Sequence, residues 1–411
     1  MQSEIADPFE FYSRMLEENP VHRDQTSGVW AIYSYDQCKT ILEHPFALIP
    51  PLVNNAKIPL NEYAQSITGS VVRLRNGEQH RLSRQITMLL FSKMQPIPLP
   101  EMISWLIPAV DDPLVRGDRP IMIDWVATVC MKLPVLAVLR GFGFNEVDSE
   151  IMVDKIGQLV TIMLAHKTDR QVVAINGISE GIYKLAEEVF ATSGWARDIL
   201  NPYAKSGMPG GEDLLSLCVG NLIGLIIQGY EAGRGLLSNT LLQILLHRGR
   251  YGGFSREKCG TGADGYDRGA GASGSEGGNQ SFFYKSVMET LRFDPPVHNT
   301  RRVAGEDIVI DGQTIRKGES ILVVLAAANR DPRHFDNPNR YDIHRKNNDE
   351  HMTFGDGHHM CLAKYFSTAM TAGTVDYLFS RFPNIELIDR NIEYEPKLNV
   401  RLPKRLLIGL S

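Results

Sequence analysis

Residues 354–363 read Phe-Gly-Asp-Gly-His-His-Met-Cys-Leu-Ala, a loop that is punctuated by glycine and ends in a cysteine. An apolar, helix-forming stretch follows at once, from Leu362 to Phe379. A thiolate at Cys361 would therefore lie at a helix N-terminus, where backbone N–H groups and the helix dipole favour negative charge. Gly355 and Gly357 allow the backbone to take positive φ values and to approach a flat ligand closely.

This loop matches the pattern F-G-x-G-x-H-x-C and resembles the haem-ligating loop of the cytochrome P-450 superfamily. The resemblance implies that Cys361 is the metal ligand of haem b and that Phe354, Gly355, His359 and Ala363 help to hold the cofactor. Two other interpretations fit the loop alone. One is a tight turn with a buried free cysteine, and the other is a small metal site built from His358, His359 and Cys361.

The composition is that of an ordinary globular protein. The 411 residues are 43% apolar and 22% charged, and the net charge of −5 argues against a nucleic-acid partner. Five scattered cysteines without CxxC spacing are typical of a reducing compartment. The polar, acidic start is unlike a signal peptide, and the longest apolar run, Leu214–Ile227, is too short to span a membrane. We therefore expect a cytoplasmic protein without membrane contact.

Hydrophobic periodicity predicts a mainly helical chain. Helices are expected over Pro8–Glu18, Tyr35–Glu43, Glu78–Leu90, Val153–Phe190 with a break near Asn176, Leu214–Leu246 and Phe282–Phe293, and strands over Trp30–Tyr33, Ile308–Ile310 and Ile321–Leu325. The run 214–246 is apolar on most faces and must pass through the protein centre. Residues 45–75 are read as an irregular loop. The Gly/Ser-rich stretch 248–280 is read as a surface insertion that is either flexible or disordered, within one domain that covers 1–411.

Charged residues around the cysteine strengthen the resemblance. Glu289 and Arg292 share a helix face, and Arg340 follows in Asn-Pro-Asn-Arg-Tyr. They resemble the family's E-x-x-R and P-x-R-F elements, which implies that the three interlock and brace the cysteine loop. Alone, the Glu-x-x-Arg pattern would more often be a surface ion pair.

Further cations are suited to the two propionates of a haem. The family places propionate partners at positions that correspond here to His80, Arg84, Arg302 and His359. Each of these residues by itself would more often be an ordinary surface cation. Together with the segment Ala-Asn-Arg-Asp-Pro at 328–332, they follow the family order, so the resemblance covers most of the chain. It implies the soluble bacterial type of the cytochrome P-450 fold, a helix-rich domain with a small β-rich lobe.

The long central helix departs from the family pattern. Members usually show A-G-x-[DE]-T, in which the acid and the threonine relay protons, whereas this chain has Gly229, Glu231 and then Ala232. If a substrate hydroxyl or a water replaces the missing hydroxyl, the enzyme remains a monooxygenase. Otherwise it uses peroxide, or performs coupling, dehydration or isomerisation without oxygen insertion. Arg234 is expected to pair with Glu231 or with an acidic substrate group.

By family analogy, the substrate pocket is lined by mainly apolar segments. These are residues 45–75, 157–185, 221–232, 297–300 and 398–400, with Asn54, Asn55, Asn61 and Asn299 as polar contacts. They imply a mid-sized, mainly apolar substrate such as a secondary metabolite. Because the chain carries no fused reductase module, a separate ferredoxin and its reductase are expected to deliver electrons, steered by Arg81, Lys364 and Arg345. A different class of hypothesis is a haem-binding carrier or sensor without turnover.

Overall fold

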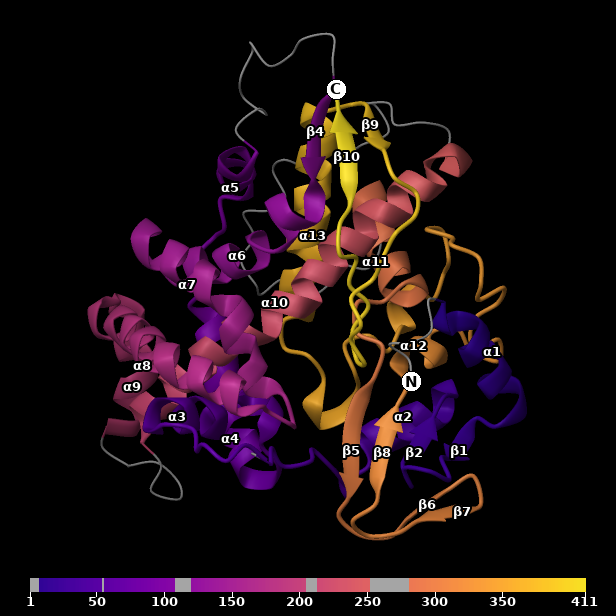
Figure 1. Cartoon of the computed structure of the whole chain (residues 1–411), viewed down its shortest axis with the longest axis horizontal. Coiled ribbons are helices and arrows are strands. Elements are labelled where there is room, and N and C mark those ends of the chain that lie inside the picture. The colour runs from indigo at the N-terminus through magenta and orange to yellow at the C-terminus, as the bar shows by residue number, and fades with distance from the viewer. Residues whose placement is uncertain (1–6, 54, 108–119, 205–212, 252–280) are drawn as a thin grey trace.

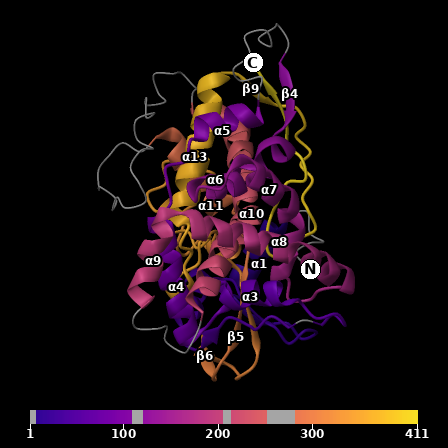
Figure 2. The same ribbon diagram turned by 90° about the vertical axis from the view of Figure 1, so that its left-hand side faces the viewer.

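A computed structural model describes residues 7–53, 55–107, 120–204, 213–251 and 281–411. One long helix, α10 (Leu214–His247), runs through the centre of the helical body, and other helices surround it (Figures 1 and 2). The other described helices of eight or more residues are α1 (Pro8–Glu18), α2 (Tyr35–Glu43), α3 (Glu62–Ser70), α4 (Gly77–Ser92), α5 (Leu99–Leu106), α6 (Leu133–Gly141), α7 (Glu146–Leu159), α8 (Asp169–Thr192), α9 (Gly194–Ala204), α11 (Phe282–Phe293) and α13 (Lys364–Arg381).

The central position of α10 follows from its sequence. Asp213 caps the helix by accepting hydrogen bonds from the backbone N–H groups of Leu215 and Ser216, and almost every residue from Leu217 to Leu245 is buried. Helices α3, α4, α6, α8, α11 and α13 all contact it. The expected buried helix over 214–246 is therefore confirmed. The helix is also long and apolar enough to cross a membrane, contrary to the expectation that no run is long enough. However, 61% of its most apolar segment is buried inside the protein.

Three small sheets form the β-rich part. The largest has the order β1-β2-β8-β5-β3, in which β2 and β8 pair in parallel and the other neighbours are antiparallel. The strands are β1 (Val21–Arg23), β2 (Trp30–Ile32), β3 (Ala47–Leu48), β5 (Thr300–Ala304) and β8 (Ser320–Val323). A second sheet joins β4 (Ile121–Asp124), β10 (Leu407–Leu410) and β9 (Ile385–Leu387), and a hairpin joins β6 (Ile308–Ile310) and β7 (Gln313–Ile315). The mainly α class with a small β lobe is confirmed.

Two predictions about local structure are wrong. The break expected near Asn176 lies instead at residues 160–168, and α8 continues through Asn176 because a capping box of Thr168 and Gln171 starts it later. The stretch 45–75 is not a continuous loop, since α3 begins after Asn61, whose side chain accepts a hydrogen bond from the backbone N–H of Ala64. Of the predicted insertion, residues 248–251 form a short 3-10 turn that continues α10, and residues 252–280 lie outside the described residues.

Short connecting elements complete the description. A π-helix covers Val126–Cys130, and one helical turn, α12 (Leu325–Ala328), precedes the segment 329–332. Short 3-10 turns occur at η2 (Val72–Leu74), η5 (Val160–Met163), η7 (Arg248–Tyr251), η9 (Asn348–Glu350) and η10 (Gly357–His359). The cysteine loop contains η10 and packs against α2, and η2 packs against α3 and α4. The cysteine loop meets the N-terminal half of α4 at His80 and Arg84, and η2 directly precedes the same helix, so the candidate site is found at this end of α4.

Candidate functional site

The cysteine loop is held by its own backbone. The N–H of Cys361 donates to the carbonyl of Phe354 over 2.9 Å, and the N–H of Met360 donates to the carbonyl of Gly357 over 3.1 Å. Gly355 and Gly357 have φ values of 70° and 65°, as predicted. A Cβ at Gly357 would lie 2.6 Å from the carbonyl oxygen of Leu42, so only glycine fits against α2 at this point.

The electrostatics of Cys361 result from opposing effects. Burial raises the pKa of its thiol, whereas a hydrogen bond from the backbone N–H of Ala363 and the charges of Arg73 and Arg84 lower it. Helix α13 begins three residues later, so the thiol lies just before a helix N-terminus. The residue is enclosed by protein and yet remains accessible to a water-sized sphere. Both conditions hold if the cysteine lines an internal hollow.

Cations surround this cysteine. The Nη1 of Arg84 donates to the carbonyl of Met360 over 2.9 Å. Arg302 is only 3% exposed, and its Nη1 donates to the carbonyl of Arg301 over 2.8 Å. The rings of His80 and His359 lie 3.9 Å apart between their centroids. All four predicted propionate partners are therefore found in the neighbourhood of the cysteine loop.

The two histidines of this group are neutral at ordinary pH. Desolvation, with the charge of Arg84, lowers the pKa of His80 to about 4. Desolvation, with the neighbouring His80 and Arg302, lowers the pKa of His359 to about 3. The histidines can therefore donate one N–H each to an anion without adding charge, while the arginines supply the positive charge.

Sequence reasoning missed one member of the cluster, Arg73. It lies on η2, and it combines an accessible side chain with an enclosed position, as Cys361 does. Its charge acts on Cys361 and, by repulsion, helps to lower the pKa of Arg302 to about 10. An isolated arginine within Val-Val-Arg-Leu-Arg carries no signal of its own, and only the fold turns it toward the cysteine.

The cluster fits a flat dianionic cofactor. Within the described ranges, no carboxylate forms an ion pair with Arg73, Arg84 or Arg302, and the buried Nε of Arg302 has no hydrogen-bond acceptor. Burying such charges without counter-charges is unfavourable. The two propionates of a haem would supply the missing negative charge, and Cys361 would supply the axial ligand. In contrast, the described residues contain no group of three His, Cys, Asp or Glu residues that could hold a metal ion, so the alternative site of His358, His359 and Cys361 is not formed.

A fully buried ion pair lies behind the cysteine loop. The Nε and Nη2 of Arg292 donate to the two carboxylate oxygens of Glu289 over 2.9 and 2.6 Å, and both side chains are 0% exposed. Arg292 also donates to the carbonyls of Asn329, Pro338 and Arg340 over 3.0, 2.9 and 3.2 Å. The expected brace is therefore present, and it ties α11 to two later segments of the chain.

The third charged member of this brace differs from the prediction. The side chain of Arg340 is exposed, and only its backbone carbonyl takes part. Arg345 instead points inward with its side chain 7% exposed, and its Nε lies 3.5 Å from Glu289. Arg345 is thus a brace and not the exposed cation that was expected to steer an electron donor. Tyr341 packs below it and donates to the carbonyl of Ser286 over 3.0 Å.

The opposite wall of the site is formed by α10. The helix is unbroken from Gly229 to Gly233, and a Cβ at Gly229 would meet nothing within 4 Å. Glu231 and Ala232 are half-buried. The carboxylate of Glu231 accepts a hydrogen bond from the Nζ of Lys397 over 2.5 Å. The wall therefore offers space at Gly229, one carboxylate that is already paired, and a methyl group where the family pattern has a hydroxyl.

The expected pairing of Arg234 with Glu231 is wrong. Arg234 instead binds Glu395 over 2.5 Å and the carbonyl of Pro403 over 3.2 Å. Lys397 bridges the two acids, since its Nζ lies 4.0 Å from Glu395 and 2.5 Å from Glu231. Four charges therefore link α10 to the segment 395–397, which explains how an arginine is tolerated within an apolar helix.

Of the four predicted polar substrate contacts, three form hydrogen bonds within the protein and one lies outside the described residues. Asn61 caps α3, and Asn299 donates to the carbonyl of Leu398 over 2.8 Å. Asn55 hydrogen-bonds to His166 over 2.7 Å, and Asn54 lies outside the described residues. These asparagines hold the backbone of the surrounding segments and leave the apolar positions to define the pocket.

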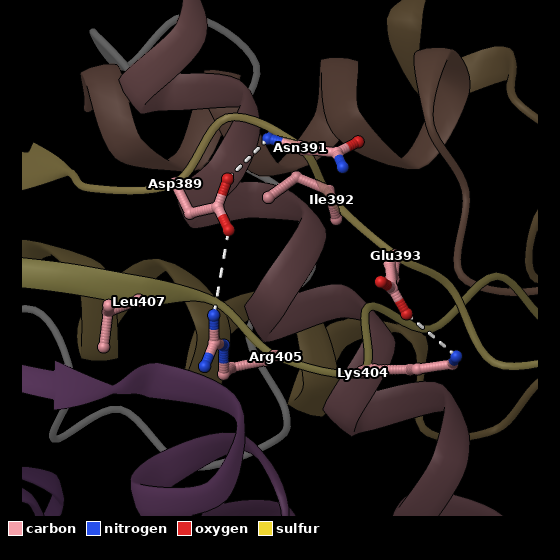
Figure 3. Close-up of a pocket in the computed structure, with 7 residues that line it drawn as sticks. All are labelled: Asp389, Asn391, Ile392, Glu393, Lys404, Arg405 and Leu407. Carbon is pink, nitrogen blue, oxygen red and sulfur yellow. Dashed lines mark hydrogen bonds and ion pairs between the residues drawn. The ribbon is translucent and has the colours of Figure 1, made fainter.

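Two surface pockets lie away from the hollow. The pocket in Figure 3 has a volume of about 320 Å³ and is lined by Asp389, Asn391, Ile392, Glu393, Lys404, Arg405 and Leu407. Its acids face its bases, with Asp389 and Arg405 3.7 Å apart and Glu393 and Lys404 3.0 Å apart. A second groove of about 440 Å³ includes Lys285, Arg345, Lys346 and Lys364, together with the acidic Asp349. Of the other two cations that were expected to steer a donor, Lys364 lines this groove, while Arg81 is exposed and paired with Glu78.

Comparisons with known proteins agree with this geometry. The cytochrome P450 family model matches residues 282–399. The chain is 34% identical over 195 residues to the biotin biosynthesis cytochrome P450 of Bacillus subtilis, a match that covers 47% of this chain and 42% of the relative. It is 25% identical over 422 residues to the cytochrome P450 monooxygenase PikC of Streptomyces venezuelae, which covers 100% of this chain and 91% of the relative.

Solved structures match over the whole chain. The structure of P450BioI in complex with an acyl carrier protein carrying hexadec-9Z-enoic acid has a TM-score of 0.77 at 22% identity, and covers 100% of this chain and 99% of that one. CYP109E1 from Bacillus megaterium, in complex with testosterone, has a TM-score of 0.75 at 21% identity, and covers 98% and 99%. Members of the family so matched bind haem b through its iron. This chain is therefore similar to cytochrome P450 proteins, through the family model over residues 282–399 and through its fold over nearly the whole chain.

Proposed function

We propose that this protein is a haem-thiolate monooxygenase that inserts an oxygen atom, by hydroxylation or epoxidation, into a mid-sized and mainly apolar molecule. The observation that supports the proposal is that Cys361 is enclosed by protein and yet accessible, within reach of the charges of Arg73 and Arg84, which have no carboxylate partner among the described residues. In this proposal residues 1–411 act as a single haem domain. The haem, when bound, supplies the activation of dioxygen.

The chain's own residues have distinct proposed roles around the cofactor. Cys361 would hold the haem iron through its sulfur, and the N–H of Ala363 would tune the sulfur by donating a hydrogen bond. His80, Arg84, Arg302 and His359 bind the propionates. Phe354 and Gly355 form the loop that lets the backbone approach the flat ring closely. These roles concern binding and orientation and require no movement of the loop.

Glu231 is the proposed proton-transferring group on the opposite wall. It is held within hydrogen-bond distance of Lys397, which can pass a proton to it or fix its orientation. Gly229 leaves room beside it, and Ala232 offers no hydroxyl. A hydroxyl of the substrate or a water must therefore complete proton delivery if dioxygen is the oxidant.

A separate ferredoxin and its reductase are the proposed electron donors. The groove that contains Lys285, Lys346 and Lys364 provides positive charge next to the start of α13, and therefore close to the cysteine. Complementary charge accelerates association with an acidic protein. We expect a higher rate of reduction at low salt than at high salt, measured by stopped-flow absorbance.

The absorption spectrum of the dithionite-reduced protein under carbon monoxide tests the proposed function first. A strongly red-shifted Soret band that is lost in Cys361→Ala is expected, because only a thiolate donates enough electron density to the iron. A histidine-type band in the wild type, or no haem in a folded protein, would contradict the proposal. Neither result depends on knowing the substrate.

A second candidate function is peroxide-dependent or non-oxygenating chemistry, such as coupling, dehydration or isomerisation. The methyl group of Ala232 and the existing pairing of Glu231 favour it. The variant Ala232→Thr distinguishes this second candidate from the proposed monooxygenase. Unchanged or lower product formation with dioxygen would mean that the substrate or a water already fills the role. Product from peroxide alone, without gain from the threonine, would favour the second candidate. A wild type without product from any oxidant would favour a haem-binding carrier.

A further inference from the structure

The substrate class can be narrowed by counting charges around the hollow, on the basis of the proposed function. Arg73, Arg84 and Arg302 contribute three positive charges, and none of the three forms an ion pair with a carboxylate of the described residues. A ferric haem has two propionates, and its iron–porphyrin core carries a single positive charge that the thiolate of Cys361 cancels. The propionates therefore balance two of the three arginines, and one positive charge is left over.

Of the three arginines, Arg73 is the one that we expect to remain without a propionate partner. Arg84 is fixed on the cysteine loop by its bond to the carbonyl of Met360, and Arg302 is fixed on β5 by its bond to the carbonyl of Arg301. Arg73 has no such anchor among the described residues, and its side chain is accessible although enclosed. It is thus a charged side chain that is available to a ligand inside the protein.

The carboxylate that attracts Arg73 is already paired. Glu231 lies close enough to act on the charge of Arg73, but its Oε1 accepts from Lys397 over 2.5 Å. Lys397 and Glu231 together are neutral, so they do not remove the surplus charge. The position of Arg73 beside α10 is fixed through its neighbour, since the N–H of Val72 donates to Asn221 of α10 over 3.0 Å.

We propose that Arg73 binds an anionic group of the substrate, a carboxylate or a phosphate, on the wall of the haem cavity. The rest of the substrate extends along the apolar wall toward Gly229, where a side chain would meet no neighbour. A guanidinium forks to either oxyanion with two parallel hydrogen bonds, and does so most strongly where water is excluded. Arg73 is then a residue that determines specificity for acidic over neutral molecules of the same shape.

The test measures ligand binding to the ferric, haem-loaded protein, and the shift of the Soret band reports the binding. Decanoate, decyl phosphate and decanol serve as probes of one chain length that differ only in their head groups. The variants are Arg73→Leu, the conservative Arg73→Lys, and the control Arg81→Leu, which removes an exposed arginine of α4 that is paired with Glu78.

We expect the wild type to bind at least one of the two anions about tenfold or more tightly than decanol. Arg73→Leu should lose this preference and bind decanol as before. Arg73→Lys should keep part of it, and Arg81→Leu should keep all of it. Comparing decanoate with decyl phosphate shows whether the site prefers a carboxylate or a phosphate. Equal binding of charged and neutral probes by the wild type, no binding of either anion, or an unchanged preference in Arg73→Leu would overturn the proposal.

Haem retention separates this role from a third propionate contact. Transfer of haem to an excess of apomyoglobin should proceed at a similar rate from Arg73→Leu and from the wild type. Several-fold faster loss, with the anion preference retained, would make Arg73 a propionate partner and overturn the proposal. These measurements need no turnover, so they are independent of the oxidant. Failure of the proposed function would appear instead as the absence of a thiolate-type band under carbon monoxide.

Discussion

The two walls of the hollow are built in different ways. On the cysteine side, Glu289 and Arg292 are fully buried, and Arg292 hydrogen-bonds to three backbone carbonyls besides Glu289. On the α10 side, Glu231 and Lys397 form one ion pair, with the lysine side chain 39% exposed. The cysteine side follows the family pattern and is rigid, whereas the α10 side departs from it at Ala232. Cofactor binding is therefore expected to be robust, and oxygen chemistry to be adjustable by few substitutions.

The largest effect should come from breaking the brace on the cysteine side. Arg292→Leu leaves the buried carboxylate of Glu289 without its partner, which should lower the free energy of unfolding by about 3–5 kcal/mol. The matched control is Arg316→Leu, which removes an arginine that is paired with Asp307 but is 70% exposed. Arg316→Leu should lower the free energy of unfolding by less than about 1 kcal/mol. Urea denaturation of the holoprotein measures both, and similar losses in the two variants would contradict the contrast between the walls.

The next largest effect is expected on catalysis, from a substitution on the α10 side that leaves the fold intact. Glu231→Gln keeps the shape of the side chain but removes its charge and its basicity, so product formation with dioxygen should fall about 100-fold. Turnover driven by peroxide should change much less, because peroxide already carries the protons. Glu393→Gln, at an exposed acid paired with Lys404, is the control and should leave both rates unchanged. An unaltered dioxygen rate in Glu231→Gln would remove this residue from proton transfer.

Much of the cysteine side could be predicted from the sequence, because its determinants are local. Helices α1, α2 and α11 have the predicted bounds, since Asp7 and Ser281 cap the first and the last through their side chains. The glycines of the cysteine loop take the predicted positive φ values. In these segments the residue type alone restricts the backbone, so no tertiary information is needed.

The missed features depend on tertiary contacts. Helix α3 was hidden by the prolines of 50–59, which end before the helix begins at Glu62. Arg340 and Arg345 both follow Pro338, and only packing against α11 decides that Arg345 turns inward. The partners of Arg234 lie 161 and 169 residues along the chain. No pattern within one segment reports on such pairings, and the same holds for Arg73.

The choice between Arg340 and Arg345 gives the third prediction. Arg345→Leu removes hydrogen bonds to the carbonyls of Asp336 and Asn337, 2.6 and 3.2 Å long, together with a contact to Glu289. It should lower the free energy of unfolding by about 1.5–3 kcal/mol. Arg340→Leu, whose backbone carbonyl is preserved, should cost no more than about 0.5 kcal/mol. The reverse order in urea denaturation would restore Arg340 as the brace.

The smallest expected effect tests whether water is excluded from the buried side chains on the cysteine side. His351 is 6% exposed, and its Nδ1 accepts a hydrogen bond from the N–H of Thr353 over 3.2 Å. Desolvation, with the charges of Lys364 and Arg292, lowers its pKa in the folded protein to about 3. In the unfolded chain the same pKa is about 6.5. Between these two values the unfolded state binds a proton that the folded state refuses, so stability falls as the pH is lowered from about 6.5 toward about 3.

The wild type should therefore lose about 1–2 kcal/mol more stability than His351→Gln between pH 7 and pH 5, at up to about 1.4 kcal/mol per pH unit. Other buried histidines, such as His298, contribute equally to both proteins and cancel in this difference. Urea denaturation at the two pH values measures it. Identical pH dependence in the two proteins would mean that water reaches His351 and that the cysteine side is less dry than its ion pair suggests. The contrast between a dry wall that holds the cofactor and a more solvated wall that handles protons would then have to rest on Glu289 and Arg292 alone.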